Sequence, residues 1–183
     1  MPFPLGPQSE GREPQYTDPP ALLIQILRRL RRVTGLRSRR PRELAADQTP
    51  MVSVLQHALE RLPADTLVLL QPTSPVRETG LVDRCIRQFQ RSGADSLATG
   101  YLCKAQEYGK LDTQRQDFRG FFADDGSVYV IQAGLLRQGD RYGKKIERVI
   151  LDREQNLDLD DEFDFWMAEQ VLERRARMAG VLR

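Results

Sequence analysis

Two acidic residues near the end of the chain have the spacing of a metal-binding pair. Asp158 and Asp160 lie within the run N-L-D-L-D-D-E at 156–162. In an extended segment, side chains repeat every two residues, so both carboxylates would point the same way, about 6–7 Å apart. Such a pair can hold one hard divalent cation, with waters and phosphate oxygens completing its shell.

The same stretch also has a purely structural interpretation. Asp161 is a good helix N-cap, and Glu162 and Asp164 suit the positive end of a helix dipole. This interpretation explains those three acids but not Asp158 and Asp160, which precede the cap. Metal binding and helix initiation therefore both stay open on the residues alone.

A polar turn follows a short apolar run in the middle of the chain. Residues 66–70 (T-L-V-L-L) are typical of a strand buried in a parallel sheet, and Q-P-T-S-P follows directly. Open α/β sheets bind ligands at the carboxyl ends of their strands. Gln71, Thr73 and Ser74 could therefore hydrogen-bond a nucleotide or a sugar, although Pro and Ser also suit an ordinary turn.

The elements that must position these groups alternate between helix and strand. Periodicity predicts further strands at 95–102, 127–131 and 145–151, and helices at 21–35, 50–62, 79–91 and 161–178. Strand, helix and strand over 66–102 predict a βαβ unit, and hence an α/β fold with a parallel sheet at least here. The last helix is expected to bury Phe163, Trp166, Met167 and Val171.

Composition limits the kinds of site that the chain can contain. It has 183 residues, the length of one ordinary domain, and a net charge of +2, too small to argue for nucleic-acid binding. One histidine and two cysteines argue against a zinc enzyme, a disulfide scaffold or a self-sufficient Ser-His-Asp hydrolase. Without an apolar run of about 18 residues or a secretory leader, we expect no membrane span and a cytoplasmic location.

Charge is nevertheless unevenly distributed along the chain. Residues 28–42 contain eight arginines and no acid, whereas 152–164 contain seven acids and one arginine. The two segments could bind a polyphosphate and its metal, or they could be solvated helix faces. Residues 1–20, rich in proline, glycine and polar residues, are expected to be disordered or loosely attached to a domain at 21–183.

Five motifs, in order, resemble the acylneuraminate cytidylyltransferase family, which includes the CMP-sialic acid synthetases. They are R-P-R-E-L-A-A-D at 40–47, L-L-Q-P-T-S-P-V-R at 69–77, D-G-S-V-Y-V at 125–130, Y-G-K-K-I at 142–146 and L-D-L-D-D-E-F-D at 157–164. The resemblance spans about residues 36–173. It implies a Rossmann-like nucleotide-diphospho-sugar transferase fold with a mostly parallel sheet, incomplete at its N-terminus, and a homodimer.

The resemblance also implies an activity. It is the Mg²⁺-dependent transfer of CMP from CTP to the anomeric hydroxyl of a nine-carbon keto-sugar acid of the sialic type, with release of pyrophosphate. Asp158 and Asp160 would bind the metal, and Gln71, Thr73 and Ser74 would contact the sugar acid. By the same resemblance, the nucleotide would be held by Arg40 and the backbone around Met51, and Lys110 would be a further contact to the sugar.

One departure from the family bears on activity. The family's phosphate loop, similar to I-P-A-R-G-G-S-K, does not occur in these 183 residues. Three hypotheses follow: an active nucleotidyltransferase, a truncated and catalytically inactive homologue that acts in dimerisation or sugar binding, and a nucleic-acid-binding module. The third is the weakest, because the arginine-rich segment lacks interleaved aromatic residues. We expect pyrophosphate release to be slow or absent.

Overall fold

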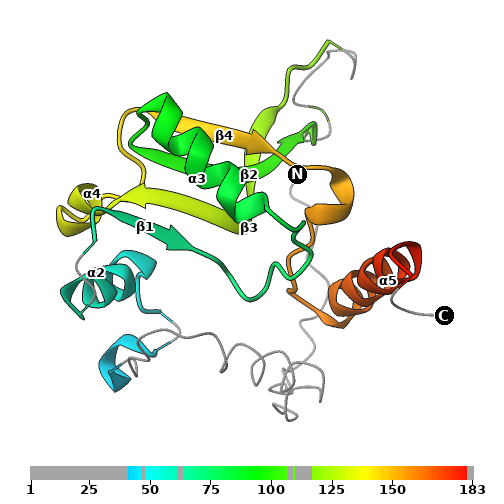
Figure 1. Ribbon diagram of the computed structural model, residues 1–183, viewed down its shortest axis with the longest axis horizontal. Coiled ribbons are helices and arrows are strands. Elements are labelled where there is room, and N and C mark those ends of the chain that lie inside the picture. Colours follow the sequence, from blue (N-terminus) through cyan, green and yellow to red (C-terminus); the bar gives the residue numbers. More distant parts are fainter. Residues whose placement is uncertain (1–40, 47, 62–63, 107–108, 110–116, 181–183) are drawn as a thin grey trace, which may run out of the picture. The chain divides into compact units, whose positions relative to one another are not determined.

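The computed structural model describes residues 41–46, 48–61, 64–106, 109 and 117–180 (Figure 1). The expected disorder of residues 1–20 and the helix expected at 21–35 lie outside this part of the chain. Within it, the elements follow one another in this order: η1 (Arg42–Leu44), α2 (Met51–Arg61), β1 (Thr66–Leu69), α3 (Leu81–Ser92), β2 (Ser96–Cys103), β3 (Phe121–Gln132), α4 (Ala133–Arg137), β4 (Ile146–Ile150), η2 (Arg153–Gln155) and α5 (Glu162–Met178).

The described strands form one mixed sheet in the order β1-β3-β2-β4. β3 runs antiparallel to both β1 and β2, and β2 and β4 pair in parallel. The expectation of a mostly parallel sheet is therefore wrong. β1 and β2 do point the same way, as a strand-helix-strand unit requires, but β3 lies between them and takes both sets of backbone hydrogen bonds.

Two apolar clusters lie on the two faces of this sheet. On one face, α3 contributes Leu81, Cys85 and Phe89, which pack on strand residues such as Leu97 and Val130. Figure 1 shows α3 lying across the strands. The second cluster is formed by α2 and α4 with alternate residues of β3: Leu55, Leu59, Tyr129, Ile131, Ala133 and Leu136. Alternation along β3 thus divides the core in two.

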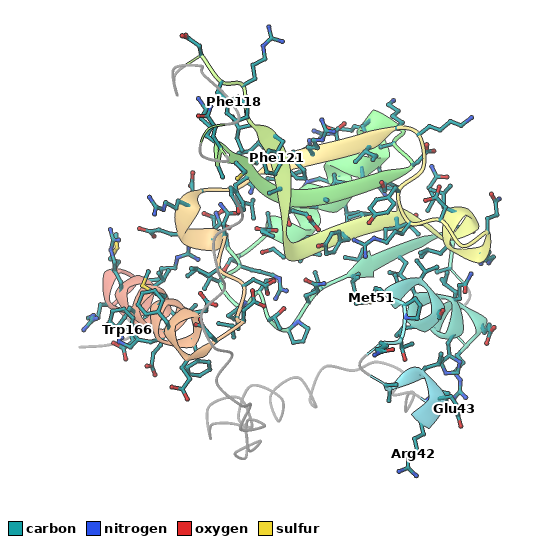
Figure 2. The ribbon with its side chains drawn as sticks, turned by 180° about the vertical axis from the view of Figure 1, so that it is seen from behind. Arg42, Glu43, Met51, Phe118, Phe121 and Trp166 are labelled. Atoms are coloured by element: carbon teal, nitrogen blue, oxygen red, sulfur yellow. The ribbon has the colours of Figure 1, made fainter. Side chains whose placement is uncertain are left out.

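The helix α5 begins at the expected position. Asp161 accepts hydrogen bonds from the backbone N–H groups of Phe163 (2.9 Å) and Asp164 (3.0 Å), and Asp164 bonds back to the N–H of Asp161, which completes a capping box. The expected burial of Phe163 and Trp166 is wrong, because they are 64% and 50% exposed. Trp166 is labelled on α5 in Figure 2.

No helix in the described part of the chain is both long enough and apolar enough to cross a bilayer.

Candidate functional site

The polar turn 71–75 lies at the carboxyl end of β1 and is attached to β3. The backbone N–H of Gln71 donates to the carbonyl of Gly126 (3.2 Å), and the Ser74 hydroxyl donates to the carbonyl of Asp125 (2.8 Å). Ser74 is fully buried, whereas Thr73 is exposed and Gln71 is half-buried. Of the three predicted ligand contacts, Ser74 therefore anchors the turn, and Gln71 and Thr73 retain access to solvent.

Gly126 permits the close approach of this turn to β3. Its φ is +73°, and a Cβ built on it would lie 2.2 Å from Oε1 of Gln71 and 2.5 Å from Oγ of Ser74. Both distances are far below van der Waals contact, so a side chain at this position would displace the turn. The Gln71 side chain thus lies directly against the backbone of Gly126, which sets its position.

Hydrogen bonds of Arg77 and Asp125 hold the turn and the adjoining part of β3 in place. The Arg77 guanidinium donates to the carbonyls of Ser127 (2.7 Å) and Gln71, and Asp125, only 6% exposed, accepts from the Thr99 hydroxyl (2.6 Å) and the Ser127 N–H (3.0 Å). Burial lowers the pKa of the Arg77 guanidinium, and the neighbouring Asp125 carboxylate opposes that shift. Sequence reasoning assigned neither residue a role, although both stand inside the L-L-Q-P-T-S-P-V-R and D-G-S-V-Y-V motifs.

The acidic pair lies beside the same turn. The backbone N–H of Leu159 donates to the carbonyl of Thr73 (2.8 Å), which joins two segments that are far apart in sequence. Leu159 is half-buried, whereas Asp158 and Asp160 on either side of it are exposed. This alternation is that of an extended segment, and it leaves both carboxylates on the solvent side.

The donor set of this pair can be compared with the needs of a metal ion. Within the described residues, no group of three or more His, Cys, Asp or Glu side chains could hold a metal. The protein would thus offer two carboxylates, Asp158 and Asp160, which take no part in the helix cap. Mg²⁺ commonly keeps several waters and binds through one or two carboxylates plus substrate phosphates, so the pair fits this ion.

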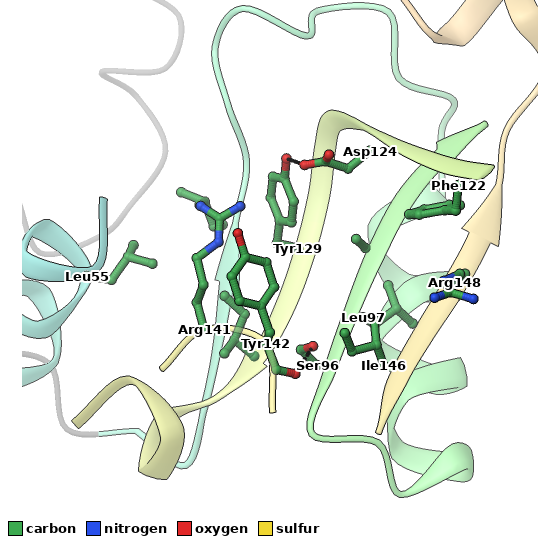
Figure 3. Close-up of a pocket in the computed structure, with 13 residues that line it drawn as sticks. Leu55, Ser96, Leu97, Phe122, Asp124, Tyr129, Arg141, Tyr142, Ile146 and Arg148 are labelled. Carbon is green, nitrogen blue, oxygen red and sulfur yellow. Dashed lines mark hydrogen bonds between the residues drawn. The ribbon is translucent and has the colours of Figure 1, made fainter. Parts of the chain in front are cut away.

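A pocket of about 170 Å³ lies on the face of the sheet opposite α3 (Figure 3). Leu69 lines it, two residues before Gln71, and so does Tyr129, which pairs with Leu69 across the sheet. Arg141 contacts two of its aromatic rings, with its guanidinium carbon 5.6 Å from the ring centre of Tyr129 and 4.9 Å from that of Tyr142. The pocket thus lies over the sheet, and its lining contains Leu69 of β1 but no residue of the turn 71–75.

The pocket combines positive charge with aromatic surface. Arg148 also lines it, 5.6 Å from the ring centre of Phe122. The Tyr129 hydroxyl donates to Asp124 (2.5 Å), and burial together with this hydrogen bond raises the pKa of Tyr129. Its phenol therefore stays protonated at neutral pH. Guanidinium groups beside apolar walls suit an organic anion. Two of the sequence motifs, D-G-S-V-Y-V and Y-G-K-K-I, contain the pocket residues Tyr129 and Tyr142, although sequence reasoning gave these residues no role.

The remaining predicted site residues are placed as follows. Met51 is the first residue of α2, half-buried against the cluster of Leu55 and Leu59 (Figure 2). Arg40 and Lys110 lie outside the described residues. The structure thus brings Gln71, Thr73 and Ser74 together with the segment of Asp158 and Asp160. The sugar, metal, nucleotide and lysine contacts assigned to these residues all stay predictions.

Comparison with known proteins finds relatives of this chain at low sequence identity. No family model matches the sequence. An alignment of 159 residues, 24% identical, relates 75% of this chain to 68% of the post-translational flagellin modification protein B of Campylobacter coli. A second, also of 159 residues and 24% identical, relates 75% of this chain to 37% of the N-acylneuraminate cytidylyltransferase of Escherichia coli O18:K1:H7 (strain RS218 / NMEC). The chain thus spans little more than a third of the latter's length.

Proposed function

We propose that this chain binds CTP with Mg²⁺ and a nine-carbon keto-sugar acid, and that it transfers CMP to the sugar's anomeric hydroxyl. The observation that carries the proposal is the hydrogen bond from Leu159 N–H to the Thr73 carbonyl, which joins the acidic pair to the polar turn. Similarity to an N-acylneuraminate cytidylyltransferase supports a nucleotidyl transfer. Because the identity is low, the substrates are part of the proposal.

The reaction forms one bond and breaks another at the α-phosphorus of CTP. The anomeric oxygen attacks and becomes bonded to phosphorus, its proton passes to solvent water, and the bond to the pyrophosphate oxygen breaks. Asp158 and Asp160 would hold Mg²⁺, which when bound offsets negative charge on the phosphate oxygens. Gln71 and Thr73 would orient the sugar acid beside the triphosphate, with the amide of Gln71 held against Gly126.

The pocket supports binding of the acid end of such a substrate. Arg141 and Arg148 supply positive charge for a carboxylate, and the rings of Tyr129 and Tyr142 supply apolar surface for the C–H groups of a sugar. At about 170 Å³ the pocket is smaller than a complete ligand site. It therefore suits one end of a ligand, and we propose that this end is the carboxylate of the sugar acid.

Binding of the sugar acid without transfer is the alternative function. It is favoured by the combination of this pocket with a sequence that contains no glycine- and lysine-rich phosphate loop. A triphosphate needs several positioned donors, and each charge-assisted hydrogen bond contributes roughly 1.5–3 kcal/mol. For this reason we expect transfer by the 183-residue chain to be slow.

Pyrophosphate release tests the proposal. The chain is incubated with CTP, Mg²⁺ and a sialic-type acid, beside Asp160→Asn and the control Glu162→Gln, which removes an exposed acid two residues away. We expect slow release that needs all three components, is lost in Asp160→Asn and persists in Glu162→Gln. Release that is equal in Asp160→Asn would refute the assigned site. No release, together with calorimetric binding of the sugar acid, would replace transfer by the alternative function.

A further inference from the structure

One part of the pocket lining is a loop, the segment 138–145 between α4 and β4. It contributes Arg141 and Tyr142 to the lining (Figure 3). Arg141 is half-buried against the rings of Tyr129 and Tyr142, and it forms no ion pair within the described residues. A guanidinium whose face lies on aromatic rings keeps its edge N–H groups for an anion. The position of this loop therefore decides where the pocket presents its positive charge.

The side chain of Asp140 holds the first half of the loop. One of its carboxylate oxygens accepts from the backbone N–H of Tyr142 (2.8 Å), and the other accepts from that of Gly143 (3.1 Å). The backbone N–H of Asp140 itself donates to the carbonyl of Leu135 in α4 (3.0 Å). Arg141 thus lies inside a turn that the Asp140 carboxylate closes, and this turn is anchored to a helix.

The second half of the loop is held by residues at the start of β2. The Asp95 carboxylate accepts from the backbone N–H groups of Lys144 (2.8 Å) and Lys145 (2.9 Å), and the Ser96 hydroxyl donates to the Tyr142 carbonyl. Gly143 allows this close approach, because a Cβ built on it would lie 2.3 Å from the Cβ of Asp95. These contacts do not involve Asp140, so losing the Asp140 carboxylate would release only the part of the loop around Arg141.

Two carboxylates together bind four consecutive backbone N–H groups, those of residues 142–145. A loop without such bonds has more backbone conformations available, and a ligand that needed one of them would have to offset the entropy of ordering it. A loop that is already ordered avoids this cost. The affinity of the pocket for an anion should therefore depend on the carboxylates that order the loop.

We propose that Asp140 is a positioning residue of the pocket, and that it holds Arg141 where the carboxylate of the sugar acid binds. This inference rests on the proposed function, because it takes the sugar acid as the ligand of the pocket. Asp140 does not itself line the pocket. It acts through the loop backbone, since direct contact of its carboxylate with an anionic ligand would be repulsive.

The second arginine of the pocket provides an internal comparison. Arg148 stands on β4, where it pairs with Ala98 of β2 in the sheet, and it lies beside the ring of Phe122. Its position is fixed by the strand and not by the loop. Asp140 should therefore affect ligand binding through Arg141 and not through Arg148.

Calorimetric titration of a sialic-type acid into the full chain tests the role of Asp140. We expect Asp140→Ala to raise the Kd about tenfold, because the turn around Arg141 opens. Asp140→Asn should restore part of the affinity, since its amide oxygen can still accept one of the two hydrogen bonds. The matched control is Asp152→Ala, which removes an exposed acid outside the pocket and should leave the Kd unchanged.

Two double-mutant cycles distinguish positioning of Arg141 from a general loss of structure. Effects that act through one residue are not additive, so Asp140→Ala should change the Kd little in the Arg141→Ala background. In the Arg148→Ala background it should keep its effect of about tenfold. If Asp140→Ala does not fold by far-UV circular dichroism, Asp140→Asn takes its place in both cycles.

The outcomes separate this inference from the proposed function. An affinity that Asp140→Ala leaves unchanged, or an equal effect of that substitution in both arginine backgrounds, would overturn the inference alone. A wild-type chain that does not bind the sugar acid would overturn both the inference and the proposed substrate. Because every arm measures binding, the result does not depend on whether the chain releases pyrophosphate.

Discussion

At the scale of single residues, the site depends on contacts that leave little room for another side chain. The Gln71 amide rests on Gly126, Arg77 donates to the Gln71 carbonyl, and the backbone of Leu159 donates to Thr73. A change at Gly126 or Arg77 would therefore act on the position of Gln71 without touching a ligand.

Substitutions at two glycines distinguish the cost of backbone strain from the cost of a clash between the polar turn and β3. Gly126 and Gly80 both have positive φ, but a Cβ on Gly80 would meet nothing within 4 Å. We expect Gly80→Ala to cost about 1 kcal/mol in the free energy of unfolding, from backbone strain alone. Gly126→Ala adds a clash with Gln71 and Ser74 and should cost about 3 kcal/mol. Denaturant unfolding of both variants measures the difference; equal costs would show that the turn moves freely away from β3.

At the scale of elements, helices and strands were predictable because their patterns are local. The predictions at 79–91 and 95–102 correspond to α3 and β2, and Asp161 caps α5 as its position before an apolar run indicates. The contacts of a helix face are not local information. The apolar residues Phe163 and Trp166 predicted a buried stripe, yet within the described part of the chain they are exposed.

Asp95 joins the end of α3 to the start of β4 and makes that junction sensitive to acid. Its carboxylate accepts from the backbone N–H groups of Lys145 (2.9 Å) and Lys144 (2.8 Å), and these bonds lower the pKa of Asp95. A lowered folded-state pKa means that the stabilisation is present above about pH 4, the unfolded-state value, and is lost as the pH falls through the folded-state pKa.

We therefore expect Asp95→Asn to lower the free energy of unfolding at neutral pH and to have a diminishing effect as the pH falls below about 4. Denaturant unfolding at several pH values measures this. Asp152→Asn is the matched control, because Asp152 is an exposed carboxylate that makes no capping hydrogen bond with its side chain. An effect of Asp95→Asn that does not change with pH would contradict the assigned role of the carboxylate.

At the scale of the whole molecule, strand order was the feature that the sequence could not supply. Apolar runs indicate which strands are buried, but not which strand lies next to which. β3 returns between β1 and β2, so two antiparallel pairs replaced the parallel pair expected there.

The sequence also did not indicate which residues of the site lie next to one another. The motifs named Gln71 and Asp160 separately, but the pocket of Tyr129, Arg141 and Arg148 arises from β3, the following loop and β4. These residues belong to different segments that come together only in the folded sheet. Two motifs do contain pocket residues, Tyr129 and Tyr142, but nothing in their spacing along the chain shows that both line one pocket.

Metal-dependent nucleotide binding tests most directly the central claim that the acidic pair and the polar turn form one nucleotidyltransferase site. CTP is titrated calorimetrically into the wild-type chain, Asp160→Asn and Glu162→Gln, each with Mg²⁺ and with a chelator. The account predicts that the wild type and Glu162→Gln bind CTP better with Mg²⁺, and that Asp160→Asn loses this dependence, with affinity lower by about tenfold or more. CTP affinity that is the same with and without Mg²⁺ in the wild type, or that Asp160→Asn leaves unchanged, would contradict it.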